Sequence, residues 1–339
     1  MSKKLGFSIF AHGNNWSYPS TRAVWQEAER LGFEAAWTQD NIMGHSPYVP
    51  ADIAYYEIFT LLAALADATS KIRIGPMATP AVRRIPPLLA KMVASIDSIS
   101  GGRMNLGIGA GDDELQYRAW GQPFPPAGQR VEILRESIEI MKRMWTQDRA
   151  SFEGKHFRIE NVAMYPKPVQ KPHPPIWIAI GQGTKLMPRV AAEYGDGIGV
   201  EWGDDQRVRK ITEALERNCE ELKRDISEIT RGRLVWIVFT DGTLDHDAAI
   251  EGIYDVVRGK KGPRPPHAYF DVLDPVVHGT PEQVVQGLQR RVLSLGFDHV
   301  IAVPIAVGID VDTGGLKGSE GNFIGAMRYL AEKIVPEFN

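Results

Sequence analysis

The sequence is short of cysteine, of long apolar runs and of net charge. Cys219 is the only cysteine in 339 residues, so a disulfide within the chain is impossible and a cysteine-rich zinc site is excluded. The longest apolar stretch, "IFTLLAALA" from Ile58, is too short to span a bilayer. A net charge of -3 gives no electrostatic footprint for nucleic acid or an anionic membrane surface. The N-terminal "MSKKLGFSIFAHGNNW" lacks the apolar core and cleavage site of a secretion signal, so we expect a reduced, cytoplasmic protein.

What the chain does contain is an alternation of short apolar strands and amphipathic helices. Strands are predicted at residues 5–11, 33–39, 71–79, 103–109, 176–181, 197–201, 233–240 and 297–305. Helices are predicted at residues 20–32, 55–69, 86–100, 130–145, from about 184, 206–225, 246–259, 280–296 and 321–338. Ser20 is expected to cap the first helix at its N-terminus and Gly32 at its C-terminus.

Eight strand–helix units predict an α/β fold, a (β/α)8 TIM barrel formed by residues 1–339 as a single domain. Insertions interrupt the alternation after strands four and seven, at about residues 151–175 and 258–280. We expect the first to form a β-hairpin with an extended connection laid over the barrel, and both to wall the substrate space. A doubly wound sheet is the alternative, which would need only about five or six strands.

The stretch "GIGAGDD" after the fourth strand looks like a nucleotide-binding glycine loop. A dinucleotide fingerprint needs a third glycine three residues after the second, and that position is Asp112, whose carboxylate would repel a phosphate. We therefore expect Gly109, Ala110 and Gly111 to clear space for a flat ring or a substrate close to the backbone. The alternative is that these glycines only bend the chain at the barrel rim.

Other loops at predicted strand ends carry polar or glycine-rich sequence. In "IAIGQGTK", Gly181 and Gly183 allow close approach and the amides of the next helix attract an anion, unless this is an ordinary turn. In "GPMATPAVRRIPP", Arg83 and Arg84 are suited to meet an anion, although a surface basic pair is the favoured interpretation.

Two histidines and an acid–amide pair are candidates for chemistry. In "WTQDNIMGH", Asp40 is suited to be a helix cap or a buried acceptor, Asn41 to bind a ligand carbonyl, and His45 to act as a general acid near neutral pH. His12 closes the first strand with the same ambiguity as His45, between a catalytic role and plain exposure. The other histidines show no ligand spacing and the chain has no HExxH sequence, so no metal is expected.

Several stretches together carry a resemblance to a known family. They are "FEAAWTQDN", "ADATSKIRIGPMATP", "LLAKMVASIDSISGGRMNLGIGAGDDE", "RVEILRESIEIMKRMW" and "PIWIAIGQGTKLMPRVAAEYGDGI". They resemble the luciferase-like family, the bacterial-luciferase superfamily of flavin- and deazaflavin-dependent enzymes, most strongly over residues 30–200. The resemblance implies the barrel. It also implies one of two chemistries, oxygen activation with reduced FMN or hydride transfer with coenzyme F420, and "GAGDD" followed by a helix is similar to the F420 reductase branch.

The resemblance also implies site residues. It places a non-prolyl cis peptide at Met77-Ala78 behind the cofactor ring, an acidic residue near the ring at Asp40, and a proton-transfer position at Asp112. The expected cofactor-binding set is Asp40, Met77, Ala78, Thr79, Gly109, Ala110, Gly111, Ala179, Ile180, Gly181, Gln182, Gly183 and Thr184, with the amides of residues 181–184 on the cofactor phosphate. The expected catalytic set is His45, Asp112, His12 and Asn41.

One departure from the family pattern bears on the reaction. Sugar-phosphate dehydrogenases of this family carry a histidine where this chain has Asn41, and a tryptophan where it has His45. Alcohol oxidation of that type is therefore in doubt, whereas an imine, enone or nitroaromatic acceptor fits. The expected function is hydride transfer between reduced F420 and a small organic acceptor, with His45, His12 or Asp112 handling the proton.

Two alternatives stay open. One is an FMN-dependent monooxygenase served by a separate flavin reductase, and the other is a flavin-binding barrel without catalysis. Related barrels usually pair through their early helices, so a homodimer is expected. No nucleic-acid or membrane partner is expected.

Overall fold

The computed structural model describes residues 4–13, 15–44, 53–181, 183–201, 203–258 and 276–338. The first half contains β1 (Gly6–Phe10), α1 (Tyr18–Arg30), β2 (Ala35–Thr38), α2 (Ile58–Ala68), β3 (Arg73–Pro76), β4 (Thr79–Pro80), α3 (Pro86–Ile99), β5 (Leu106–Gly109), α4 (Glu114–Ala119) and α5 (Ala127–Thr146). The second half contains β6 (Ala150–Glu153), β7 (Arg158–Val162), β8 (Ile176–Ile180), α6 (Leu186–Tyr194), β9 (Gly197–Val200), α7 (Asp205–Leu222), β10 (Thr230–Phe239), α8 (His246–Arg258), β11 (Val276–Gly279), α10 (Pro281–Arg291), β12 (His299–Ala306) and α11 (Gly318–Lys333). Short 3-10 turns lie at Ile226–Glu228, Leu293–Leu295 and Val335–Phe338.

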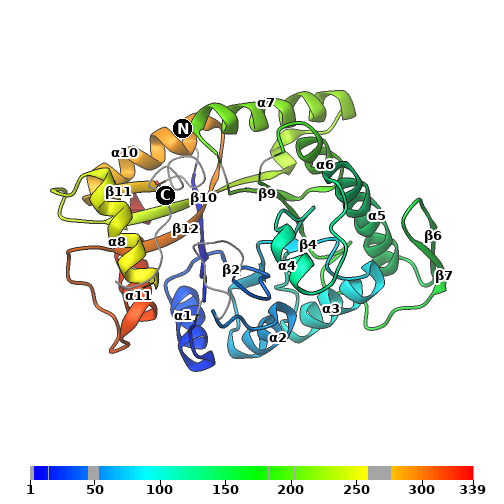
Figure 1. Cartoon of the computed structure of the whole chain (residues 1–339), viewed down its shortest axis with the longest axis horizontal. Coiled ribbons are helices and arrows are strands. Elements are labelled where there is room, and N and C mark those ends of the chain that lie inside the picture. The colour runs from blue at the N-terminus through cyan, green and yellow to red at the C-terminus, as the bar shows by residue number, and fades with distance from the viewer. Residues whose placement is uncertain are drawn as a thin grey trace.

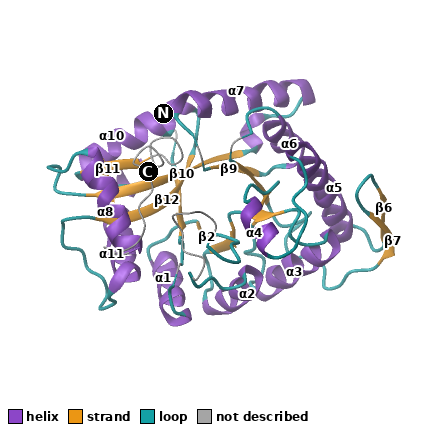
Figure 2. Cartoon of the chain, in the orientation of Figure 1, coloured by secondary structure: helices purple, strands orange, loops and turns teal. Residues whose placement is uncertain are grey.

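One parallel sheet runs through the chain in the order β3-β2-β1-β12-β10-β9-β8-β5-β4. A bridge between Ile74 and Met104 joins β3 to the start of the β5 segment, so the sheet nearly closes on itself. Helices surround it (Figures 1 and 2). The predicted (β/α)8 barrel fold is therefore confirmed. No helix in the described residues is both long and apolar enough to cross a membrane.

The structure adds a strand that the sequence pattern did not predict. Val276–Gly279 forms β11, which pairs in parallel with residues Trp236 to Phe239 of β10. It lies inside the segment that we expected to be irregular. Residues 259–275 of the predicted second insertion lie outside the described residues, so its expected place beside the substrate space stays a prediction.

The first helix also begins differently from the prediction. Its N-cap is Ser17, whose hydroxyl accepts a hydrogen bond from the Ser20 amide, so Ser20 lies inside the helix. The end is as expected: Gly32, at φ +81°, follows the C-cap residue Leu31. A side chain would be strained in that left-handed conformation, which explains the glycine.

Aromatic side chains fill the barrel near the start of its strands. Trp37 and Trp177 contact each other edge to face, with ring centroids 5.0 Å apart. Space for them is provided by glycine: a Cβ on Gly197 would lie 2.6 Å from the Trp177 ring, and one on Gly75 would lie 3.0 Å from Trp37. The barrel interior is therefore packed at this end, and an open space can exist only toward the carboxyl ends of the strands.

A buried polar contact lies in the same packed layer. The Ser8 hydroxyl is 2.8 Å from Nε2 of His299 and accepts a hydrogen bond from the Trp37 indole at 3.0 Å. Burial lowers the pKa of His299 to about 4, so its ring is neutral at physiological pH.

Candidate functional site

A cavity of about 700 Å³ opens at the carboxyl ends of β4, β5 and β8. Its volume is in the range of small-molecule and cofactor sites. Barrel enzymes carry their active sites at this end of the strands. The lining residues are Ala78, Thr79, Pro80, Gly109, Ala110, Gly111, Asp112, Ala127, Arg130, Val131, Ala179, Gly181, Gly183, Thr184, Lys185, Leu186, Met187 and Glu201.

The glycines of "GIGAGDD" serve different purposes. A Cβ on Gly107 would lie 2.0 Å from the Pro76 carbonyl oxygen, so β5 can approach the β3–β4 junction only with glycine there. Gly111 has φ +87°, a conformation that side chains rarely adopt. Gly109 faces the cavity and has only ordinary contacts with Ala179. The motif therefore shapes a wall and is not the opening of a dinucleotide fold.

The neighbouring wall is the β3–β4 junction. The Met77-Ala78 peptide bond is cis, as the resemblance implied. Ala78 faces the cavity, whereas the Met77 side chain is buried and points toward Gly199, where a Cβ would lie 2.7 Å from its sulfur. Met77 therefore forms part of the floor and does not line the cavity directly.

The opposite wall is the start of α6. Gly183, Thr184 and Lys185 line the cavity there, and the N-cap position makes no side-chain hydrogen bond to the first turn. The helix amides and the Lys185 ammonium make this wall electropositive. A negatively charged group is therefore favoured at this end of the cavity.

Arg130 of α5 adds a second basic group. Its guanidinium donates to the Gly111 carbonyl at 3.0 Å and to the Pro125 carbonyl at 2.6 Å, and it lies 4.0 Å from the centroid of Phe124. Burial lowers its pKa, while the charge of Asp112 acts in the opposite direction. Arg130 thus fixes the glycine loop to α5 at the cavity edge.

Two carboxylates line the cavity, Asp112 after β5 and Glu201 after β9. Asp113 does not line it. Its carboxylate accepts from the amides of Leu115 and Gln116, at 3.0 and 3.4 Å, and so begins α4. Of the acidic run in the motif, Asp112 is the one that lines the cavity.

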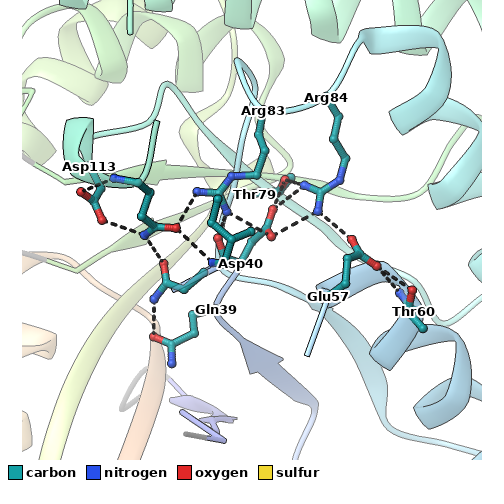
Figure 3. A network of polar contacts seen from close by, with 11 residues as sticks. Gln39, Asp40, Glu57, Thr60, Thr79, Arg83, Arg84 and Asp113 are labelled. Carbon is teal, nitrogen blue, oxygen red and sulfur yellow. Dashed lines mark hydrogen bonds and ion pairs between the residues drawn. The ribbon is translucent and has the colours of Figure 1, made fainter. Parts of the chain in front are cut away.

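Asp40 lies behind the cavity wall in a network of polar contacts (Figure 3). Its buried carboxylate contacts Arg84 at 2.5 Å, Arg83 at 3.1 Å and the Thr79 hydroxyl at 2.7 Å. Arg84 also contacts Glu57 at 2.7 Å. Burial alone would lower the pKa of Arg84, but Asp40 and Glu57 outweigh it and hold that pKa above its ordinary value. Arg83 and Arg84 do meet an anion, so the interpretation as a surface basic pair is wrong.

Gln116 of α4 connects this network to neighbouring loops. Its amide nitrogen donates to Asn41 at 3.1 Å and to Asp113 at 2.7 Å, and its carbonyl accepts from Arg83 at 3.2 Å. Asn41 in turn donates to Gln39 at 3.1 Å. Asn41 is thus placed in the loop framework and does not line the cavity.

His12 lies on another side of the mouth. Its ring stacks on Trp236 with centroids 4.8 Å apart and meets Phe10 edge-on. It borders a separate small space of about 20 Å³ with Trp16 and Phe323. The structure therefore does not bring His12 into the large cavity.

The cavity gathers much of the expected cofactor-binding set, namely Ala78, Thr79, Gly109, Ala110, Gly111, Ala179, Gly181, Gly183 and Thr184, together with Asp112. Met77 and Ile180 are buried beside it. His45 and Gln182 lie outside the described residues. Their roles stay predictions.

Other residues line the cavity without having been expected from the sequence: Pro80, Ala127, Arg130, Val131, Lys185, Leu186, Met187 and Glu201. Glu201 ends the predicted sixth strand, and a carboxylate at the carboxyl end of a barrel strand is a usable signal. Lys185 directly follows the predicted anion-binding turn. Nothing in the sequence indicates that the start of α5 reaches the cavity.

The insertion at 151–175 does not wall the cavity, contrary to expectation. Its hairpin, β6 and β7, packs on the outer side of α5 (Figure 1), where the amides of Lys155 and His156 donate to Glu136. The connection that follows lies at the other end of the barrel, where Gln170 contacts Arg73 and Asp97. No residue of 151–175 lines the cavity.

Across the described residues, no three His, Cys, Asp or Glu side chains gather as a metal site would require.

The chain is similar to known proteins over most of its length. The model of a family described as luciferase-like monooxygenase matches residues 5–299.

Two curated relatives represent both chemistries. An F420-dependent glucose-6-phosphate dehydrogenase from Intrasporangium calvum is 26% identical over 299 residues, which is 81% of this chain and 85% of the relative. An FMNH(2)-dependent dimethylsulfone monooxygenase from Pseudomonas putida is 34% identical over 177 residues, 52% of this chain and 47% of the relative.

A solved structure supports the fold. The coenzyme F420-dependent tetrahydromethanopterin reductase from Methanopyrus kandleri superposes with a TM-score of 0.77 at 21% identity, covering 99% of this chain and 100% of that one. At this identity the likeness shows the barrel and nothing finer.

Proposed function

Because the chain belongs to the luciferase-like monooxygenase family, we propose that it uses reduced coenzyme F420 to reduce a small organic acceptor. The chain is an oxidoreductase, as its relatives indicate. What we propose is its cofactor and its class of substrate. The observation that carries it is the likeness to an F420-dependent enzyme over 81% of the chain, against 52% for the FMNH(2)-dependent relative.

The residues present fit a flat cofactor with an anionic tail. Small side chains and glycine at Ala78, Gly109, Ala110 and Ala179 leave the cavity wide beside the cis peptide. The start of α6, with Lys185, forms the electropositive end. When bound, reduced F420 supplies a hydride, and the acceptor gains a C–H bond and takes up one proton.

The protein's own contribution is orientation and proton supply. The wall at residues 78–80 orients the ring, and the turn at Gly183 and Thr184 holds the tail. Asp112 and Glu201 are the carboxyl groups that line the cavity, and we propose Asp112 as the group that passes the proton. Asn41 stands where the resemblance puts a histidine, so the proposed reaction is a reduction and not an alcohol oxidation.

An FMN-dependent monooxygenase is the second candidate, and the FMNH(2)-dependent relative favours it. Titration of the purified protein with F420 and with FMN, followed by fluorescence, separates the two. We expect tighter binding of F420, and anaerobic reduction of an enone or nitroaromatic acceptor by reduced F420. Selective FMN binding with oxygen uptake from reduced FMN would overturn the proposal. A homodimer stays a prediction, which sedimentation equilibrium tests directly.

A further inference from the structure

The Asp40 carboxylate is held by side chains of the protein itself. Oδ1 accepts a hydrogen bond from Arg84 at 3.2 Å and forms an ion pair with Arg83 at 3.1 Å, and Oδ2 accepts from Arg84 at 2.5 Å and from the Thr79 hydroxyl at 2.7 Å. Three hydrogen bonds and one ion pair therefore occupy most of the acceptor capacity of this carboxylate. The side chain is 1% exposed and does not line the cavity.

Thr79 stands between Asp40 and the cavity. It belongs to β4 and borders the cavity beside Ala78 and Pro80. Its hydroxyl donates to Asp40 and also accepts from Arg84 at 3.1 Å. Arg83 and Arg84 also contact Asp40 but do not line the cavity, so we expect an effect of Asp40 on a bound cofactor to pass through the position of Thr79.

Arg84 anchors the same wall to a second segment. Both terminal nitrogens of its guanidinium donate to Asp40, which follows β2, and Nη2 also donates to Glu57 at 2.7 Å. Glu57 is the N-cap of α2 and accepts from the Thr60 amide at 2.7 Å. A planar guanidinium bound by two carboxylates is held in one orientation, so Thr79 is braced against fixed elements on both sides (Figure 3).

We propose that Asp40 and Arg84 are positioning residues that act through Thr79 on the cavity wall at residues 78–80, and that Asp40 does not touch cofactor or substrate. This inference rests on the proposed function in so far as the cavity binds a redox cofactor. It departs from the direct ring contact that the family resemblance implies for Asp40. It also assigns Arg84 a role in cofactor affinity that the sequence does not suggest.

A double-mutant cycle tests the route through Thr79. Asp40→Asn, Thr79→Val and the double variant are titrated with whichever of F420 or FMN the wild type binds more tightly, and dissociation constants are compared. We expect each single variant to bind roughly 5- to 10-fold more weakly, and the double variant to be no weaker than the poorer single variant. Thr79→Ser, which keeps the hydroxyl, should restore nearly wild-type affinity.

The opposite result is a double variant whose fold-loss of cofactor affinity equals the product of the two single fold-losses. A direct contact between Asp40 and the cofactor would act independently of Thr79 and give that result. That result overturns the inference, as does a Thr79→Val variant that binds like the wild type. If Asp40→Asn does not fold, Arg84→Gln replaces it in the same cycle, since Arg84 also contacts the Thr79 hydroxyl.

Asp298→Asn is the matched control. Asp298 accepts a paired contact from Arg231 at 3.1 and 2.8 Å, and this ion pair lies beside the first residues of β10 and β12, at the far end of the barrel. We expect this variant to lose stability while the dissociation constant is unchanged. Wild-type protein that binds FMN but not F420 overturns the proposed cofactor and leaves the cycle to be run with FMN; binding of neither overturns both.

Discussion

The two ends of the barrel differ in the size of the side chains that point into it. At the end where the strands begin, Trp37, Trp177 and His299 fill the interior, and Arg103 donates to the carbonyls of Ala66 and Ile72. At the end where the strands finish, glycine and alanine face a cavity of about 700 Å³. Partly buried arginines that donate to several partners occur at both ends, Arg103 at the first and Arg84 at the second. The size of the inward-pointing side chains therefore decides which end of the barrel is open. The arginine contacts at each end fix the neighbouring loops in place.

The largest expected effect is a difference in the free energy of unfolding between alanine variants of two glycines in "GIGAGDD". Gly107→Ala should lower the free energy of unfolding by about 3 kcal/mol or more, because its Cβ would collide with the Pro76 backbone. Gly109→Ala meets only ordinary contacts with Ala179 and should change stability by less than ~1 kcal/mol while weakening cofactor binding. Urea denaturation and cofactor titration measure both quantities. Equal stability losses would contradict the distinction between a packed position and a cavity position.

The next largest expected effect is the pH dependence of stability that His299 causes at the packed end of the barrel. His299 has a folded-state pKa of about 4, against an ordinary value of 6.5, so the unfolded chain binds a proton that the folded chain does not. The free energy of unfolding should therefore fall by about 3 kcal/mol as pH drops from 6.5 to 4.

His299→Gln separates this contribution from the titration of carboxylates. The variant keeps a polar group near Ser8 but has no imidazole that must stay unprotonated in the folded state. The difference in the free energy of unfolding between wild type and variant should therefore shrink as pH falls from 6.5 to 4. Denaturation curves of both proteins at matched pH values give the comparison. An advantage that stays constant from pH 6.5 to 4 would show that His299 is not the titrating group.

The smallest effect is expected at the electropositive wall of the cavity. Lys185→Ala should weaken binding of a cofactor with an anionic tail by roughly 5-fold, because an exposed charge contributes about 1 kcal/mol or less. The loss should shrink as salt is raised. Lys333→Ala, on α11, is the control and should leave affinity unchanged. A salt-independent loss would indicate that Lys185 acts by packing.

Much of the fold follows from the sequence because strand and helix periodicity is local. The positions of β1, β2, β3, β5, β8 and β9 all fall within predicted strands, and β12 extends one residue beyond its predicted end at residue 305. Val276–Gly279 was missed because four residues in a proline-rich neighbourhood carry little periodicity. The insertion at 151–175 was recognised as a hairpin, but a sequence does not show on which face of a barrel an insertion packs.

The site was predictable where a backbone feature leaves a sequence mark. The glycine loops are of this kind. The cis Met77-Ala78 bond was expected only from the family resemblance. The pairing of Asp40 with Arg84 leaves no such mark, because the two are 44 positions apart and their contact depends on how neighbouring loops fold. Arg130 reaches the cavity only because α5 begins there, which the helical pattern of its sequence does not specify.

The unequal lengths of β9 and β10 make the rim of the barrel asymmetric. β9 pairs with β10 only as far as Arg233, and the six residues that follow, roughly 20 Å of strand, pair with β12, the last four of them also with β11. Ladder bonds along both edges make this projecting stretch costly to deform. The loops after β4 and β5 are held by separate contacts instead, among them the hydrogen bonds from Ala81 to Gly109 and from Arg130 to Gly111. We therefore expect those loops to move when the cavity mouth widens to admit a bulky reactant or release a product. β10 and β12 should keep their positions.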